Sequence, residues 1–171
     1  YWMAFQLLTG NIDTQSRNMY LYSPTNSDTF YVLDWDNDGM LMRKEYEIKQ
    51  RSDGKSWENG ISNYWGHMLF SSCLQTKSFR TALDKAIQDE YKYMNANRIN
   101  SMVKHYRSIT EQYVWKMPDS MYEGVTKSQY DVIANQLHSE IEQNYQTYQT
   151  GFNKPMPFYI GTPTPTNGKL K

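Results

Sequence analysis

The sequence lacks most of the features by which several classes of protein are identified. Its single cysteine, Cys73, permits no internal disulfide, which disfavours a disulfide-stapled secreted module. No stretch approaches the ~18 consecutive apolar residues of a membrane span, so none is predicted. The 18 Lys and Arg residues balance the 18 Asp and Glu residues, whereas a protein that grips a phosphate backbone usually carries a basic surface. We therefore expect neither a nucleic-acid partner nor a membrane-spanning segment.

What is present is a chain of 171 residues with few aliphatic and many aromatic side chains. Hydrophobic residues make up 39% of the chain, and 15 residues are Tyr. The usual apolar share of a globular protein is about 45–50%, and a buried Tyr needs a partner for its hydroxyl group. The length suits one domain or one lobe of a larger protein. The composition predicts a thin, aromatic-rich core.

The first third of the chain predicts a helix followed by a β-hairpin. Residues 1–9 are almost continuously apolar, and Gly10 is a typical residue to end such a helix. Two aromatic and β-branched runs, Met19–Tyr22 and Phe30–Leu33, flank a turn-rich segment and are typical of paired strands. A short helix is expected near Arg43–Lys49, within a polar excursion over 43–60. Trp35 is predicted to anchor the core under the hairpin.

From Ile61 onward, apolar residues recur with the 3.6-residue period of helices. We predict four helices, over residues 63–74, 78–94, 99–117 and 128–151. In the first, Trp65, Met68 and Leu69 are expected to face the core. The Tyr and Met residues of the later helices are likewise assigned to the core, and residues 151–171 to a Pro-rich linker or the start of a further domain. The predicted fold class is mainly α with a small β-hairpin (α+β).

The chemically informative residues are Asp13, Asn18 and Asp36. Asn18 follows Asp13 by five residues, and Asp36 arrives after the hairpin, 23 residues beyond Asp13. Phosphoryl transfer in protein kinases uses one carboxylate to orient the attacking hydroxyl group, an Asn five residues later to hold a metal, and a second Asp that bridges metal and phosphates. The spacing suits those roles. The structural alternative is that Asp13 and Asn18 cap the turn after the first helix.

Three motifs in this region resemble the CotH kinase family, the atypical protein kinases of bacterial spore coats. They are Leu8-Thr9-Gly10-Asn11-Ile12-Asp13, Asn18-Met19-Tyr20-Leu21-Tyr22 and Phe30-Tyr31-Val32-Leu33-Asp34-Trp35-Asp36. The resemblance extends over residues 1–150 and implies the C-lobe of an atypical protein-kinase-like fold. Within it, residues 1–42 would form the catalytic loop, metal loop and hairpin, and residues 61–150 the helical subdomain.

The resemblance also implies an activity. The parent protein would transfer the γ-phosphate of Mg-ATP to Ser/Thr hydroxyl groups of coat or cell-surface proteins. Asp13 would be the catalytic residue, and Asn18 and Asp36 would bind the metal and nucleotide. The family's nucleotide-binding N-lobe is expected upstream of residue 1, so the chain by itself is expected to be inactive. The implied location is the bacterial spore coat or the cell surface, with the cytoplasm as an alternative.

A second motif overlaps the first. Asp34, Asp36, Asp38, Gly39 and Glu45 satisfy the EF-hand pattern D-x-[DN]-x-[DN]-G-x₅-E. An EF-hand loop follows a helix, however, and here a predicted strand precedes it. A looser calcium site at Asp34, Asp36 and Asp38 remains open, because three carboxylates within five residues repel one another and favour a cation. The alternative function is therefore a non-catalytic coat or surface interaction module with a calcium-binding, Asp-rich loop. Asp34 also stands where many relatives have Pro.

Overall fold

A computed structural model describes residues 1–152 apart from 12, 15–16, 52–63, 65–66 and 123. The predicted linker therefore lies outside the described residues, apart from residues 151 and 152. So do Trp65 and most of the polar excursion. Within the described part of the chain, no helix is both long and apolar enough to cross a membrane.

The first helix, α1 (Trp2–Thr9), is the centre of the fold. Six of its eight residues are buried, as expected of a helix that is apolar on nearly every side. It ends at Gly10, which adopts the left-handed conformation with φ of 63°. The Gly10 and Asn11 N–H groups donate to the Leu7 and Gln6 carbonyl oxygens at 3.3 and 3.0 Å, which is a Schellman ending. The predicted helix and its stop are confirmed.

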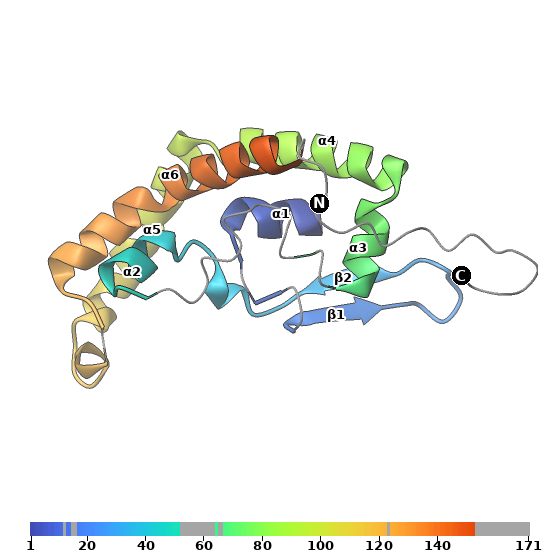
Figure 1. Ribbon diagram of the computed structural model, residues 1–171. Coiled ribbons are helices and arrows are strands. Elements are labelled where there is room, and N and C mark those ends of the chain that lie inside the picture. Colours follow the sequence, from blue (N-terminus) through green and yellow to red (C-terminus); the bar gives the residue numbers. More distant parts are fainter. Residues whose placement is uncertain (12, 15–16, 52–63, 65–66, 123, 153–171) are drawn as a thin grey trace, which may run out of the picture.

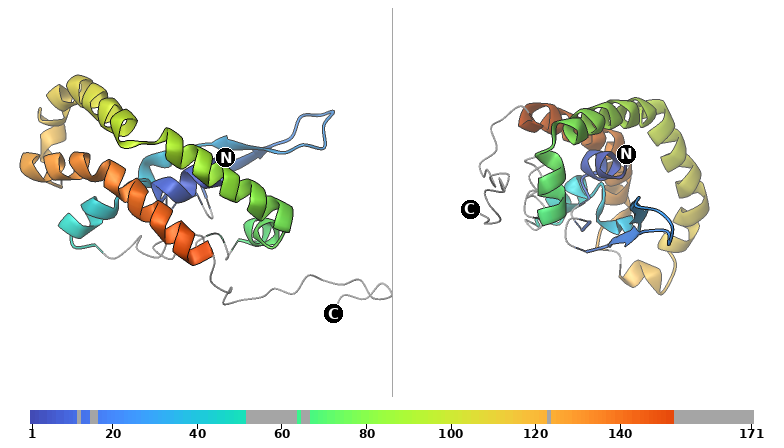
Figure 2. Two further views of the ribbon diagram at one scale, coloured as in Figure 1. Left: turned by 90° about the horizontal axis from the view of Figure 1, so that it is seen from above. Right: turned by 90° about the vertical axis from the view of Figure 1, so that its right-hand side faces the viewer.

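Two long helices pack against α1. They are α4 (Lys77–Tyr93) and α6 (Lys127–Phe152), and both lie above α1 in Figure 1. Seen end-on in Figure 2, α1 lies inside a ring of the other elements. Leu8 of α1, Ile87 of α4 and Ile141 of α6 are completely buried at their meeting point. The core is thus organised around the first helix of the chain.

The predicted hairpin forms on the opposite side of α1 from α4 and α6 (Figure 1). Strands β1 (Met19–Tyr22) and β2 (Tyr31–Asp34) pair antiparallel, with Met19 opposite Asp34. After β2 come the short 3₁₀ helix η1 (Asn37–Gly39) and the helix α2 (Arg43–Ile48). The strand, the loop and the short helix therefore follow one another as the sequence predicts.

The remaining elements complete a mainly helical fold with one small two-stranded sheet, which confirms the predicted fold class. They are α3 (Met68–Leu74), α5 (Ala96–Val114) and the short 3₁₀ helix η3 (Asp119–Met121). Helix α5 packs on α6, and α3 packs on α4. The predicted helical stretches therefore all contain helices, although α3 begins at residue 68.

Three assignments to the core were wrong. In α3 the buried residues are Phe70, Ser71 and Leu74, whereas Met68 is 82% and Leu69 40% exposed. The inward face is therefore offset from the predicted one. Trp35 is 59% exposed and makes an edge-to-face contact with Tyr20, at 6.3 Å between ring centroids. Trp35 therefore lies on the surface of the fold and not in its core.

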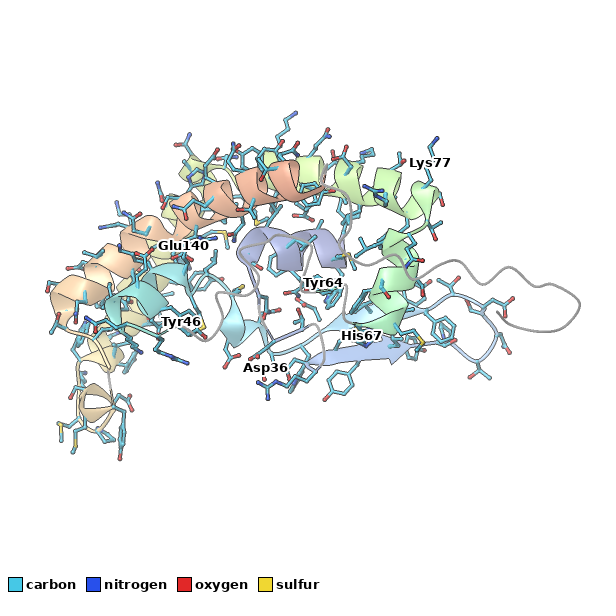
Figure 3. The ribbon with its side chains drawn as sticks, in the orientation of Figure 1. Asp36, Tyr46, Tyr64, His67, Lys77 and Glu140 are labelled. Carbon is cyan, nitrogen blue, oxygen red and sulfur yellow. The ribbon has the colours of Figure 1, made fainter. Side chains whose placement is uncertain are left out.

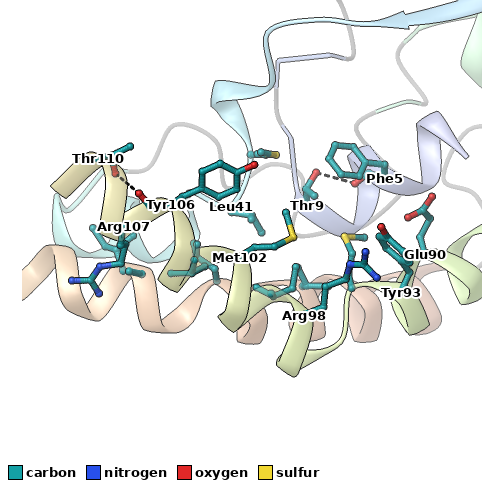
Figure 4. Close-up of a pocket in the computed structure, with 18 of the residues that line it drawn as sticks. Phe5, Thr9, Leu41, Glu90, Tyr93, Arg98, Met102, Tyr106, Arg107 and Thr110 are labelled. Carbon is teal, nitrogen blue, oxygen red and sulfur yellow. Dashed lines mark hydrogen bonds between the residues drawn. The ribbon is translucent and has the colours of Figure 1, made fainter. Parts of the chain in front are cut away.

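The apolar stripe of α5 is not buried either. Among its described residues none is buried, and Met102, Tyr106 and Tyr113 are each about half exposed. Part of this stripe lines an apolar groove between α5, α1 and α6 with a volume of about 500 Å³. Figure 4 shows Phe5 and Thr9 of α1 facing Met102 of α5 across this groove. The predicted period of α5 is right, but its inward face borders a groove instead of a closed core.

Candidate functional site

Asp13 lies in the loop between α1 and the hairpin, four residues after the C-terminal end of α1. Its backbone N–H donates to Asn11 Oδ1 at 3.0 Å, and Asn11 is itself buried. Arg17 donates to Asp13 Oδ1 at 3.1 Å, but Arg17 is largely exposed, and exposed pairs of this kind contribute at most about 1 kcal/mol. The other carboxylate oxygen, Oδ2, lies 3.4 Å from the Cβ position of an alanine built at Gly39. Asp13 therefore sits beside the loop that follows Asp36.

The hairpin brings Asn18 and Asp36 to the same end of the sheet. Because Met19 pairs with Asp34, both residues lie just beyond the paired positions, and Figure 3 shows Asp36 at this end of the hairpin near η1. Each adopts a left-handed backbone, with φ of 55° at Asn18 and 54° at Asp36. Asn and Asp tolerate this conformation better than other side chains, and such residues cluster at functional sites. The structure thus places all three predicted kinase-type residues around one loop junction.

The side-chain amides of Gln6, Asn11 and Asn37 form a hydrogen-bond network that connects α1 to this junction. Gln6 of α1 donates from Nε2 to Asn37 Oδ1 and to Asp34 Oδ1, both at 3.0 Å. Asn11 donates to the same Asn37 oxygen at 3.0 Å. Gln6 and Asn11 are almost fully buried, whereas Asn37 is half-buried and Asp34 exposed, so these bonds are partly shielded from competing water. Helix α1 therefore fixes the position of the loop after β2.

Gln6 is a site residue that the sequence analysis missed. The sequence does contain an indication of its role, because Gln6 is the one strongly polar side chain within the apolar run of residues 1–8. A polar group inside a buried helix needs a partner. Nothing local identifies Asp34 and Asn37 as those partners, since they lie 28 and 31 residues away.

The same network gives Asp34 a structural role. Its Oδ1 accepts from Gln6 and its Oδ2 accepts from Asn37 Nδ2 at 2.9 Å, so amide donors occupy both oxygens. In the part of the chain that the structure describes, no three His, Cys, Asp or Glu side chains gather closely enough to hold a metal ion. The loop also follows strand β2, where an EF-hand would have a helix. The carboxylates of Asp34, Asp36 and Asp38 do not converge as the calcium alternative requires.

The loop of Asp13 is held at two further points. Thr14 Oγ1 lies 3.0 Å from the Tyr64 hydroxyl oxygen, and both side chains are buried. Burial raises the pKa of Tyr64 above its ordinary value, so Tyr64 stays protonated. On the other side, the Leu41 N–H donates to the Thr9 carbonyl at 2.8 Å. This bond ties the end of α1 directly to the segment after η1.

Substitution of Gly39 can test how closely the loop that contains Asp13 must approach the loop that follows Asp36. An added Cβ would lie 3.0 Å from Asn11 Oδ1, and Asn11 is buried and hydrogen-bonded. We expect Gly39→Ala to lower the free energy of unfolding by roughly 1–3 kcal/mol, the usual cost of overpacking, in a urea titration. Gly124→Ala is the matched control, since its Cβ would meet only the end of the Lys49 side chain at 3.0 Å. Equal losses in the two variants would contradict a tight contact at Gly39.

The architecture is that of a mainly helical lobe with an acidic loop junction at the base of a hairpin. Residues 1–148 match the family model described as CotH kinase protein, so the chain belongs to the CotH kinase family. Membership of this family implies a kinase-related function and an association with the spore coat. Comparisons with curated proteins and with solved structures returned no match.

Proposed function

We propose that this chain forms the C-lobe of a CotH-type protein kinase that transfers the γ-phosphate of ATP to Ser/Thr hydroxyl groups of coat or cell-surface proteins. Asp13 is assigned to orient the attacking hydroxyl group and accept its proton. Asn18 and Asp36 are assigned to hold magnesium against the nucleotide phosphates. A catalytic carboxylate and two metal ligands are the groups that the C-lobe of a kinase contributes to phosphoryl transfer.

The observation that carries the proposal is the convergence of Asp13 with the loop that begins at Asp36. Asp13 Oδ2 approaches the Cβ position at Gly39 to 3.4 Å, although the two residues lie on opposite sides of the hairpin in the sequence. The hairpin register adds Asn18 to the same end. Catalysis by a kinase depends mainly on positioning and electrostatics, and a junction whose loops are joined by hydrogen bonds to α1 suits that requirement.

The exposed face of the hairpin is the proposed contact surface for a nucleotide and an N-lobe. On one face of the sheet lie Tyr20 and Tyr22 of β1, with Tyr31 and Leu33 of β2, and each is about half exposed. An isolated two-stranded hairpin is marginally stable in water, and a continuous exposed apolar face typically marks an interaction site. A second lobe packed over this face would bring its own phosphate-binding groups next to Asp36.

Nucleotide binding provides a direct test of the two-lobed arrangement. We expect the 171-residue chain to bind Mg-ATP too weakly to detect by calorimetry, because in a kinase much of the phosphate contact comes from the N-lobe. A longer form of the protein that carries the proposed N-lobe, called the two-lobed protein below, is expected to bind Mg-ATP in the micromolar range and to transfer phosphate to Ser or Thr. Micromolar binding by the chain alone would contradict the division of the site between two lobes, and the absence of phosphotransfer in the two-lobed protein would contradict the function.

A further inference from the structure

Two buried polar residues on one face of α6, Glu140 and Asn144, bind the two helix ends that border the candidate site: the start of α2 and the end of α1. They are four residues apart, which places them on the same side of a helix, and each is only 2% exposed. Figure 3 shows Glu140 on α6 beside α2. Both lie in the interior of the fold, where a polar side chain must be hydrogen-bonded to be tolerated.

Glu140 binds the start of α2. Its Oε1 accepts from the Lys44 N–H at 2.7 Å and its Oε2 accepts from the Arg43 N–H at 3.1 Å. These are the first two residues of α2, whose N–H groups have no partner within the helix. The residue that precedes the helix, Met42, supplies no side-chain cap. A carboxylate from a helix about a hundred residues later in the chain therefore caps α2.

Asn144 binds the end of α1. Its Nδ2 donates to the Leu8 carbonyl at 2.8 Å, in a fully buried bond. Leu8 lies in the last turn of α1, where carbonyl groups lose their helical partners. With this bond the last carbonyls of α1 are accounted for, since those of Gln6, Leu7 and Thr9 accept from Asn11, Gly10 and Leu41. Asn144 Oδ1 also accepts from the Arg43 guanidinium at 3.4 Å.

These two helix ends are the fixed points from which the site loops extend. The end of α1 leads within a few residues to Asp13, and the start of α2 follows the segment that contains Asp36 and Asp38. We propose that Glu140 and Asn144 are positioning residues: by holding both helix ends on one rigid helix, they set the spacing between the Asp13 loop and the Asp36 loop. This inference rests on the proposed kinase function and adds to it the residues that align the two loops.

The carboxylate of Glu140 is suited to holding the start of α2 in place. Desolvation raises the pKa of its carboxyl group, while the two backbone N–H bonds act in the opposite direction. The carboxylate offers two acceptor oxygens, and both are used. A Gln side chain would keep one acceptor but place an NH₂ group against the other backbone N–H. Glu140→Gln therefore removes one bond and creates a donor–donor contact without changing the size of the side chain.

The test combines amide hydrogen exchange in the 171-residue chain with kinetics of the two-lobed protein. In Glu140→Gln and in Asn144→Ala, we expect hydrogen exchange at the Leu41 and Asp13 amides to accelerate about fivefold to tenfold. This is the change that follows when the local free energy of opening falls by the contribution of one hydrogen bond. Neither amide is bonded to Glu140 or Asn144. The Ile87 amide, in the core of α4, serves as the internal reference and should change no more than twofold.

The kinetic arm should show kcat for phosphotransfer falling about 10–100-fold per folded molecule, with KM for ATP within about threefold, since a 1 Å misplacement can cost about 10²-fold. Glu142→Gln is the control, because it lies on the same helix and its partner Tyr91 can still donate to the new amide oxygen. That variant should match the wild type in both measurements.

The two arms separate failure of this inference from failure of the proposed function. Unchanged exchange at Leu41 and Asp13, with acceleration only at Arg43 and Lys44, would overturn the positioning role and leave Glu140 as a local cap. Accelerated exchange with unchanged kcat would overturn it as well. If the wild-type two-lobed protein transfers no phosphate, the proposed function fails, and the exchange arm alone decides whether α6 sets the spacing of the loops.

Discussion

Asp13→Asn in the two-lobed protein is expected to lower kcat for phosphotransfer by about 10²–10⁴-fold, the usual contribution of a positioned general base. The amide keeps the size of the side chain but cannot accept a proton. The bond that Arg17 donates to Asp13 at 3.1 Å joins a largely exposed partner, so its loss should change the free energy of unfolding by less than about 1 kcal/mol. The measurement is a phosphotransfer assay paired with thermal denaturation.

Asp28→Asn is the matched control for this prediction. Asp28 is an exposed carboxylate in the hairpin turn, at the far end of the sheet from the candidate site. It should retain wild-type activity, which shows that loss of a carboxylate from this region is not in itself inhibitory. Activity of Asp13→Asn close to that of the wild type would remove Asp13 from the catalytic role and favour the alternative in which it only caps the turn after α1.

Leu8→Ala should have the largest effect on stability. Leu8 is completely buried where α1 meets α4 and α6, and truncating such a residue costs about 2–5 kcal/mol. A domain of this size is stable by only about 5–15 kcal/mol in total. The midpoint of a urea titration should therefore fall sharply at an unchanged slope. Leu21→Ala in the hairpin, where the side chain is 47% exposed, should change the midpoint little.

A loss below about 1 kcal/mol in Leu8→Ala would contradict the central place of α1 in the fold. The substitution leaves the Leu8 carbonyl in place, so the bond from Asn144 is preserved. The two effects of this position, apolar burial through the side chain and hydrogen bonding through the backbone, can therefore be measured separately by comparing Leu8→Ala with Asn144→Ala.

The parts of the fold that the sequence predicted are those decided by local physics. Gly10 ends α1 because only a residue tolerant of positive φ fits there, and the alternating aromatic runs around Pro24 can pair only as a short hairpin. The residues Asp13, Asn18 and Asp36 were singled out because the roles predicted for them impose a spacing along the chain, and those roles stay a prediction. Features of this kind need no knowledge of what packs against them.

The parts that were missed depend on contacts between distant segments. Periodicity shows that one face of α3 is apolar, but only the packing of Trp2 and Tyr64 against the Phe70 ring, at 5.5 and 5.1 Å between centroids, shows that Phe70 is buried while Met68 is exposed. Trp35 looked like a core residue because large aromatic side chains usually are, yet in the described structure only Tyr20 contacts its ring among the aromatic residues. Glu140 and Asn144 carry no sequence pattern, because their partners are backbone groups and the Arg43 side chain, 96–136 residues away.

The central position of α1 has a consequence for synthesis on the ribosome. The apolar surface of α1 emerges before α4 and α6, and the buried bond from Asn144 to Leu8 joins residues 136 positions apart. At a translation rate of roughly 5–20 residues per second, α1 waits about seven to thirty seconds for its covering helix. During that interval Trp2, Phe5 and Leu8 are available for aggregation. A ribosome-bound chaperone that shields the nascent α1 segment should therefore raise the yield of folded protein more than one that acts after release.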